Sequence, residues 1–309
     1  MQTSKPSAVL EPMQVPKPSA VLELLKPITW FPPMWAFACG VISSGVPTGG
    51  HWAFIVAGII LAGPLVCATS QAVNDWFDRH VDAINEPHRP IPSGRMPGQW
   101  GLYVAIAWTL LSLLVAAALG TWVFTAAVIG LVLAWAYSAP PVRLKLNGWW
   151  GNAAVGACYE GLPWLTGAAV MLMAQPDWRV FALAGLYSFG AHGIMTLNDF
   201  KSIEGDTKVG VRSLPVQLGV DNAALIACVF MAAPQVIVIA LLIQWGQPWH
   251  ALAVAGLLAA QVLMMIRFLA DPKGRDVWYS GFGVPLYVSG MMVSAFALRY
   301  APDISTVAS

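Results

Sequence analysis

The stretch at 52–82 reads WAFIVAGIILAGPLVCATSQAVNDWFDRHVD and joins a long apolar run to a cluster of carboxylates. Residues 52–73 carry no charged side chain, and about 20 such residues form a helix long enough to cross the hydrocarbon core of a bilayer. Residues 74–82 then add Asp75, Asp78 and Asp82. The stretch therefore predicts a transmembrane helix that ends in three acids at one face of a membrane.

Runs of the same kind recur along the whole chain, which is 58% hydrophobic and only 10% charged over its 309 residues. A soluble domain carries about 25% charged residues, so lipid is the main solvent expected here. The runs predict an all-α integral membrane fold, a nine-transmembrane-helix bundle with a cavity that opens to the cytoplasmic side. The predicted spans are 28–45, 52–73, 100–120, 121–137, 152–174, 180–197, 223–244, 251–270 and 281–298.

Basic residues divide unequally between the two faces that these nine spans define. Arg179 and Arg299 fall on one face, and the other fourteen fall on the opposite face. Because Lys and Arg accumulate on the cytoplasmic side of membrane proteins, the N-terminus and the loops after the even-numbered spans are predicted to be cytoplasmic. The basic residues of this face are Lys5, Lys17, Lys26, Arg79, Arg89, Arg95, Arg143, Lys145, Lys201, Lys208, Arg212, Arg267, Lys273 and Arg275.

The chain before the first span is a short arm with an internal repeat. The sequence KPSAVLE occurs at 5–11 and again at 17–23. Prolines separate the copies and neither copy can bury a core, so residues 1–26 are predicted to be a flexible or surface-lying cytoplasmic arm. A duplication without function explains the repeat equally well. Residues 27–300 are predicted to form one membrane domain and residues 301–309 a tail.

The three acids of the opening stretch have the spacing of one helix face. Asp75, Asp78 and Asp82 are separated by three and then four residues, so their carboxylates stack along a helix. At about 5 Å and an effective dielectric constant of about 20, each like-charged pair costs on the order of 3 kcal/mol, which predicts a neutralising cation. Carboxylate oxygens favour Mg²⁺, and Asn74 adds a neutral oxygen. A solvated polar helix end is the alternative.

A second segment at 198–206, NDFKSIEGD, repeats this pattern after the sixth span. Asp199, Ser202 and Asp206 have the same spacing, and Asn198 precedes them as Asn74 precedes the first cluster. Both segments follow even-numbered spans, so they are predicted to emerge on the same face. Two such faces across a cavity could share metal ions.

Charge balance predicts basic residues at this site. The five aspartates of the two segments sum to −5. If the metal ions hold a diphosphate, that ligand adds about −3. Two Mg²⁺ ions would then leave part of the negative charge uncompensated. Arginine suits bidentate contact with phosphate and lysine acts as a point charge. Any single basic residue on this face could equally serve only to set the orientation of the chain in the membrane. The candidates on the predicted face are Arg89, Arg143, Lys145, Lys201, Lys208 and Arg212.

Two ionisable residues inside predicted spans are further candidates. Glu160 lies within the fifth span, where an ionisable group is expensive and is a functional candidate by default. A protonated Glu160 bonded to a neighbouring helix is the competing interpretation. His192 lies six residues before Asn198 and could face the cavity as a ligand or proton-transfer group.

The motifs together resemble a known family. The sequence NDWFDRHVD at 74–82 is similar to the NDxxDxxxD signature of the UbiA superfamily of intramembrane prenyltransferases. Flanking stretches resemble the chlorophyll and bacteriochlorophyll synthases within it, and the TWFPPMWAFACG stretch at 29–40 favours the bacteriochlorophyll branch. These stretches are DAINEPHRPIPSG at 82–94, YSAPPVRLK at 137–145, LNDFKSIEGD at 197–206 and GVRSLPVQLG at 210–219.

The resemblance implies a Mg²⁺-dependent enzyme, with two ions and with Mn²⁺ as an alternative, that esterifies the propionate of bacteriochlorophyllide or chlorophyllide with geranylgeranyl or phytyl diphosphate. It implies membrane lipids and pigment-biosynthesis or photosystem-assembly proteins as partners, no nucleic acid, and the cytoplasmic or intracytoplasmic photosynthetic membrane as location. Ser202 stands where many members have Asp, which favours a diphosphate or indirect contact there. The implied catalytic and metal-binding residues are Asp75, Asp78, Asp82, Asp199 and Asp206, and the implied diphosphate-binding residues are Asn74, Arg89, Arg143, Lys145, Asn198, Lys201, Ser202, Lys208 and Arg212.

Three rival functions share parts of this pattern. A 4-hydroxybenzoate or haem prenyltransferase has the same metal and diphosphate chemistry and differs in its acceptor. A CDP-alcohol phosphotransferase usually has a DGxxAR run, which the sequence lacks. A transporter should place its ionisable groups near the bilayer midplane, whereas these acids gather at one face.

Overall fold

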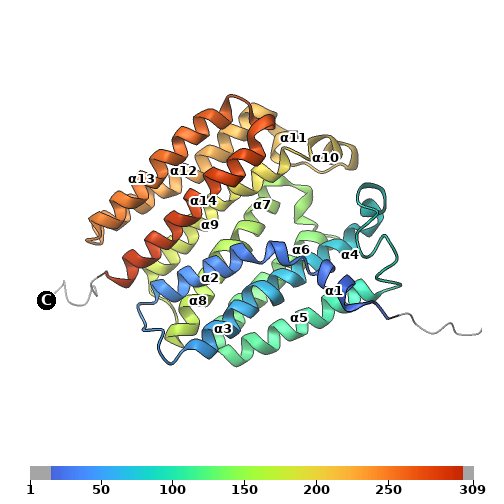
Figure 1. Cartoon of the computed structure of the whole chain (residues 1–309), viewed down its shortest axis with the longest axis horizontal. Coiled ribbons are helices and arrows are strands. Elements are labelled where there is room, and N and C mark those ends of the chain that lie inside the picture. Colours follow the sequence, from blue (N-terminus) through green and yellow to red (C-terminus); the bar gives the residue numbers. More distant parts are fainter. Residues whose placement is uncertain (1–14, 302–309) are drawn as a thin grey trace, which may run out of the picture.

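A computed structural model of the chain describes residues 15–301, and in this part the protein is a bundle of helices (Figure 1). The all-helical prediction is confirmed. The elements are α1 (Pro18–Leu24), η1 (Pro27–Thr29), α2 (Phe31–Ser43), α3 (Trp52–Ile60), η2 (Leu61–Cys67), α4 (Ala68–Asn85), α5 (Trp100–Leu119), α6 (Thr121–Ser138), η3 (Leu144–Leu146), α7 (Gly148–Gly156), η4 (Ala157–Gly161), α8 (Leu162–Leu172), α9 (Trp178–Asp199), α10 (Ile203–Val209), α11 (Leu214–Leu218), α12 (Val220–Gln244), α13 (Pro248–Leu269) and α14 (Pro272–Arg299).

Seven helical stretches within the described residues are long and apolar enough to cross a membrane. The other two predicted spans are also helical, but they differ from these seven. Helix α2 has only 13 residues, and the run formed by α7, η4 and α8 contains the polar residues Asn152 and Glu160. Nine crossings therefore stay a prediction.

Two helices are longer than predicted, and the difference matters for the site. The predicted span at 52–73 continues without a break to Asn85, so the acidic motif lies on the helix itself and not in a loop. Helix α14 begins at Pro272 instead of 281, because Asp271 caps it by accepting a hydrogen bond from the Gly274 backbone amide at 3.1 Å. Charged residues at a membrane face can continue a helix beyond its apolar part, and hydropathy alone does not show this.

Two π-helical turns interrupt the helices that surround the centre of the bundle. Segment η2 contains Pro64, which has no backbone N–H to donate, and the wider turn accommodates it. Segment η4 separates α7 from α8 and carries Glu160. Such turns often occur at functional sites in helical proteins, because they change which side chains face inward.

The second copy of the N-terminal repeat is part of the folded bundle. Residues 1–14 lie outside the described part, but 18–24 form α1, in which Ala20 and Leu24 are buried in a cluster with Ala68 and Ala72 of α4. The apolar residues of this short helix share one face, which explains the packing. For this segment the flexible alternative is therefore wrong, while the surface-lying alternative stays a prediction. Figure 1 shows α1, the end of α4, and α10 and α11 at the same end of the bundle.

Glycines allow α2 and α8 to cross in close contact. A Cβ atom at Gly40 would lie 2.0 Å from the Trp164 carbonyl oxygen, and one at Gly167 would lie 2.1 Å from the Phe37 carbonyl oxygen. Backbone atoms cannot move aside as a flexible side chain can. Small residues at such crossings permit the close approach on which helix association in membranes depends.

We expect Gly167→Leu to lower the free energy of unfolding by about 3 kcal/mol, because the added side chain would force α2 and α8 apart. Thermal unfolding of the detergent-solubilised chain measures this effect. Gly256→Leu on α13 is the matched control, since a Cβ there meets nothing within 4 Å. Equal melting temperatures for the two variants would contradict the packing argument.

Candidate active site

Helix α4 presents its acids in a row at one end of the bundle. Asp75 and Asp82 are buried, with 2% and 6% of their surface exposed, and Asp78 lies between them. Asn74 donates a hydrogen bond from Nδ2 to Asp78 Oδ2 at 3.0 Å and a second to Ser138 Oγ at 3.2 Å. The predicted helical stacking of this motif is therefore present in the structure.

Four basic side chains neutralise this row. Lys26 Nζ lies 2.6 Å from Asp75 Oδ1, and Arg89 Nη1 lies 2.9 Å from Asp82 Oδ2 and 3.5 Å from Asp75 Oδ1. Asp78 is paired with Lys145 and lies 3.8 Å from Arg143 Nη2. The repulsion between the acids therefore does not require a metal ion by itself, contrary to the argument from the sequence.

Burial shapes the electrostatics of Lys145. Loss of hydration lowers the pKa of its ammonium group, while the carboxylate of Asp78 acts in the opposite direction. The ammonium group is held at the mouth of the bundle by the short segment η3, which follows α6. Its position beside a carboxylate row suits it to contact a second anion there.

The other three predicted phosphate ligands are arranged differently. Lys201, Lys208 and Arg212 are exposed and form no ion pair with any residue of 15–301. The backbone of Arg212 nevertheless holds the loop in place, since its carbonyl accepts from the Gly148 amide at 2.8 Å and its amide donates to the Leu146 carbonyl at 2.9 Å. The structure thus groups Arg89, Arg143 and Lys145 with the acids and leaves these three at the rim.

The second acidic segment is not one continuous helix. Helix α9 ends at Asp199, a turn follows, and α10 begins at Ile203, so the same spacing is realised around a bend. Ser202 donates to the Asp199 carbonyl at 3.3 Å and accepts from the Asp206 amide at 2.8 Å through its own carbonyl. Asp199 accepts a hydrogen bond from Asn152 Nδ2 at 3.4 Å, and burial raises the pKa of Asp206. The predicted single helical face is wrong here.

The donor atoms fit a hard divalent ion only in part. Within residues 15–301 no three His, Cys, Asp or Glu side chains lie together as a group that could hold a metal ion. The available donors are nevertheless carboxylate oxygens, which Mg²⁺ prefers, and buried Asp75 Oδ2 has no hydrogen-bond partner in the described part of the chain. Mg²⁺ usually takes one or two carboxylates and completes its shell with water and substrate phosphate oxygens. The aspartates of each acidic segment are therefore numerous enough to hold it.

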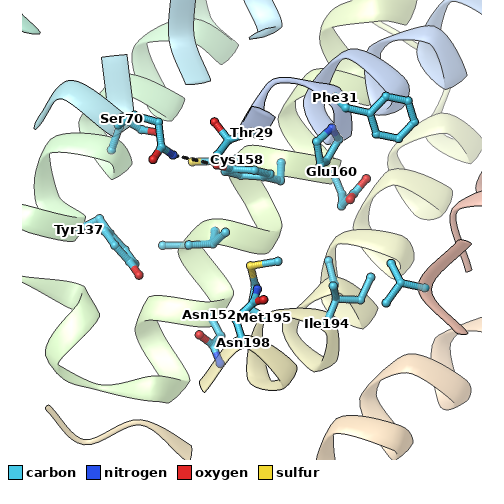
Figure 2. A pocket seen from close by; sticks show the side chains of 18 of the residues that line it. Thr29, Phe31, Ser70, Tyr137, Asn152, Cys158, Glu160, Ile194, Met195 and Asn198 are labelled. Atoms are coloured by element: carbon cyan, nitrogen blue, oxygen red, sulfur yellow. Dashed lines mark hydrogen bonds between the residues drawn. The ribbon is translucent and has the colours of Figure 1, made fainter. Parts of the chain in front are cut away.

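A cavity of about 600 Å³ begins beside the acids and extends into the bundle. Asn74, Asn198 and Asp199 belong to its polar part, and most of the remaining wall is apolar, as with Leu133 and Val284. Figure 2 shows Asn152, Asn198 and Tyr137 on two sides of the space and Glu160 beside Phe31 on another. A polar mouth joined to an apolar interior suits a molecule with a charged head and a hydrocarbon tail.

Several cavity residues were not predicted from the sequence. Gln71 Nε2 donates to the Tyr159 hydroxyl at 3.1 Å, and Cys67 Sγ lies 3.5 Å from the same oxygen. Asn152 and Lys26 are also absent from the predicted site. For Lys26 a signal existed, because it is the last basic residue before the first span, on the predicted face of the acids. The others have no distinguishing sequence pattern.

The two intramembrane candidates have different positions. Glu160 lines the cavity, whereas His192 does not. His192 lines a separate hollow with Trp149 and Phe230, and its Nε2 lies 3.1 Å from the Trp149 carbonyl. Helix α9 turns the neighbouring Ala191 and Ile194 toward the cavity instead. The prediction that His192 faces the cavity is therefore wrong.

Comparison with known proteins agrees with this arrangement. Residues 29–289 match the UbiA prenyltransferase family. The chain belongs to the UbiA prenyltransferase family. Because this match spans most of the chain, the prediction of an integral membrane prenyltransferase is confirmed and the transporter alternative is set aside.

Several relatives are similar over most of their length. The chain is 58% identical to the bacteriochlorophyll synthase 33 kDa chain of Cereibacter sphaeroides, covering 94% of this chain and 96% of the relative. It is 41% identical to the chloroplastic chlorophyll synthase of Oryza sativa subsp. japonica, covering 90% of this chain and 76% of the relative. The predicted resemblance to these synthases is thereby confirmed.

Solved structures share the fold. A structure described as digeranylgeranylglyceryl phosphate synthase superposes with a TM-score of 0.67 at 22% identity, covering 90% of this chain and 98% of that chain. A UbiA homolog from Archaeoglobus fulgidus bound to GPP and Mg²⁺ superposes with a TM-score of 0.62 at 20% identity, covering 91% and 99%. At these identities the likeness concerns the fold.

We expect Lys26→Met to lower the free energy of unfolding by about 1–3 kcal/mol in the presence of a chelator, because it leaves buried Asp75 with only the longer contact to Arg89. Excess Mg²⁺ should restore part of the melting temperature by binding the freed carboxylate. Thermal unfolding with EDTA and with Mg²⁺ measures both effects.

The control for this experiment is Lys201→Met, which removes an equal charge from an exposed position without an ion pair in the described chain. If both variants melt at the wild-type temperature under both conditions, Lys26 does not hold the acidic row.

Proposed function

We propose that the chain transfers a prenyl group from geranylgeranyl or phytyl diphosphate to the propionate carboxylate of bacteriochlorophyllide a, or of chlorophyllide a, in a Mg²⁺-dependent reaction. The products are the esterified pigment and diphosphate. The observation that carries the proposal is the 58% identity to a bacteriochlorophyll synthase along nearly the whole of both chains. The division of the cavity into a polar mouth and an apolar interior supports it.

The mouth would hold the diphosphate. Arg89, Arg143 and Lys145 already lie beside the acidic row, and their cationic groups can contact phosphate oxygens as well as carboxylates. Asn74 and Asn198 line the same end of the cavity and offer amide donors. Lys201, Ser202, Lys208 and Arg212 lie on the nearby loops, where they would contribute to initial attraction of the anion.

The acids would hold the metal ion. Asp75, Asp78 and Asp82 on one side and Asp199 and Asp206 on the other are the proposed ligands, with two Mg²⁺ ions, or Mn²⁺ in their place, shared with the substrate phosphates. When bound, the ion supplies electrostatic stabilisation of the negative charge on the leaving diphosphate. The four basic side chains of the mouth would add to that stabilisation.

The reaction itself is a substitution at C1 of the prenyl chain. The bond from C1 to the diphosphate oxygen breaks, its electron pair leaves with the diphosphate, and an allylic cation remains. A lone pair of the propionate carboxylate then forms the new C1–O bond. A carboxylic acid with a pKa of about 4–5 is already ionised at pH 7, so no general base is required.

The interior of the cavity would protect this cation from water. Its walls contain apolar side chains such as Leu133, Ile194 and Val288. Among the polar groups, the Tyr159 hydroxyl is occupied by Gln71. An apolar enclosure prevents hydrolysis, which would otherwise compete with esterification.

The orientation and location follow from the distribution of charge. We propose nine crossings, with the N-terminus and the mouth of the cavity on the cytoplasmic side, in the cytoplasmic or intracytoplasmic photosynthetic membrane. Pigment-biosynthesis or photosystem-assembly proteins are the proposed partners, together with membrane lipids. The domain from 27 to 300 would contain all of the proposed metal ligands, and Lys26 would join the basic cluster from just before it.

A related enzyme with another acceptor is the second candidate. A 4-hydroxybenzoate or haem prenyltransferase would use the same mouth with a different molecule in the interior. The similarity to chlorophyll synthases across nearly the whole chain favours the pigment acceptor.

We expect membranes containing the chain to convert labelled geranylgeranyl or phytyl diphosphate into an ester of bacteriochlorophyllide or chlorophyllide, and to leave 4-hydroxybenzoate and haem unmodified. Extraction of the lipophilic product from parallel incubations measures the choice. Prenylation of 4-hydroxybenzoate or haem with no pigment ester would replace the proposed function with its rival.

We expect Asp78→Asn to reduce pigment esterification at least about 100-fold, because it removes a carboxylate from both the metal and the basic cluster while keeping the shape of the side chain. Initial rates at saturating concentrations of both substrates measure this. Asp221→Asn, at the exposed start of α12, is the control with the same change of charge. Retention of more than a few per cent of the rate by Asp78→Asn would exclude Asp78 from the site.

A further inference from the structure

Glu160 is a buried acid that has no partner among the residues that the structure describes. Only 4% of its surface is exposed, and within residues 15–301 neither of its carboxyl oxygens forms a hydrogen bond, including the buried Oε2. It forms no ion pair in the same part of the chain. It lines the cavity from the π-helical turn η4.

Other buried polar residues of the bundle have partners on adjacent helices. Gln235 donates to Gln261 at 2.7 Å, and the Tyr287 hydroxyl donates to the Tyr187 carbonyl at 2.6 Å. Adjacent helices can therefore pair their polar groups, although Gln235 Oε1, which does not line the cavity, also lacks a partner within residues 15–301. Since an unpaired polar group costs free energy in an apolar interior, an unpaired one in a cavity wall points to a partner that enters the cavity.

The surroundings of Glu160 decide its chemical form. The cavity wall near it is apolar, with Phe31 beside it in Figure 2 and Val284 and Val288 of α14 among the lining residues. An isolated carboxylate in such a setting is expensive, and a carboxyl group instead retains its proton. In that form it can donate one strong hydrogen bond.

The position of Glu160 is suited to the acceptor molecule. Asn152, at the polar end of the cavity, precedes Glu160 by eight residues in the same helical run, which places the two on the order of 10 Å apart along its axis. A tetrapyrrole ring has comparable dimensions, so its propionate can lie at the mouth while a carbonyl carried elsewhere on the ring periphery reaches Glu160. A prenyl tail offers no atom that accepts a hydrogen bond.

We propose that Glu160 is a specificity-determining residue that donates a hydrogen bond from its carboxyl group to a ring carbonyl of the tetrapyrrole acceptor. The proposal rests on the pigment-esterifying function proposed above. The periphery of a (bacterio)chlorophyllide carries ketone and ester carbonyls, which accept hydrogen bonds and do not donate them. A protonated acid in an apolar wall is the complementary group.

The test compares Glu160→Leu with Glu160→Gln in the full chain. Leucine removes the donor, while the glutamine amide retains one. We expect Glu160→Leu to raise KM for bacteriochlorophyllide by about three- to tenfold, with little change in KM for geranylgeranyl diphosphate, and Glu160→Gln to remain within about twofold of wild type for both. Thr166→Val on α8, which does not line this cavity, is the control for disturbance of the helix.

A second readout detects the hydrogen bond directly. In the wild type, resonance Raman spectra of bound bacteriochlorophyllide should show a ring carbonyl stretch at lower wavenumber than in Glu160→Leu, and Glu160→Gln should resemble the wild type. A merely structural role of Glu160 would not move this band. If Glu160→Leu does not accumulate, the same band in the wild type, compared with the free pigment in an apolar solvent, decides the question.

The outcomes separate this inference from the proposed function. Unchanged KM values and an unchanged carbonyl band in Glu160→Leu overturn the inference while the wild type still esterifies the pigment. A selective rise in KM for the prenyl diphosphate also overturns it and places the tail beside Glu160. A wild-type chain that esterifies no tetrapyrrole refutes the proposed function itself.

Discussion

The neutralisation of a carboxylate row at the end of an apolar bundle is the constraint on which the rest of the site depends. Asp75 and Asp82 are buried, and uncompensated charges there would repel each other in a medium of low dielectric constant. The compensating cations come from separate parts of the chain: Lys26 precedes α2, Arg89 follows α4, and Lys145 follows α6. Charge balance therefore fixes three connections at the mouth of the cavity.

The same balance limits what can bind. A diphosphate adds negative charge to a mouth whose acids are already paired with basic side chains, so its binding calls for cations beyond those in the pairs. Divalent ions on the carboxylates would release the lysine and arginine side chains toward the phosphates. This exchange couples binding to the position of α1, because Lys26 directly follows a helix that packs on α4.

Periodicity and hydropathy predicted the parts of the fold that depend on a single helix. The apolar runs and the three-then-four spacing of Asp75, Asp78 and Asp82 needed no information from elsewhere in the chain. Tertiary relations were different. The same spacing in the second segment is broken by the end of α9 at Asp199, and the buried face of α1 is hidden in a repeat that resembles a linker. The missing partner of Glu160 depends on how several helices pack, which no local pattern records.

The polar groups of the cavity also bear on the choice of acceptor. An aromatic carbon must lose a proton after prenylation, whereas a carboxylate attacks in its existing ionised form. The Tyr159 hydroxyl accepts a hydrogen bond from Gln71, and Asp199 is one of the proposed metal ligands, so neither is assigned the role of a base. Glu160 lies in an apolar wall that keeps its proton in place. A cavity with these polar groups is better suited to esterify an acid than to deprotonate an aromatic ring. The choice among acids then depends on the shape of the cavity and on the few hydrogen-bond donors that face the bound pigment.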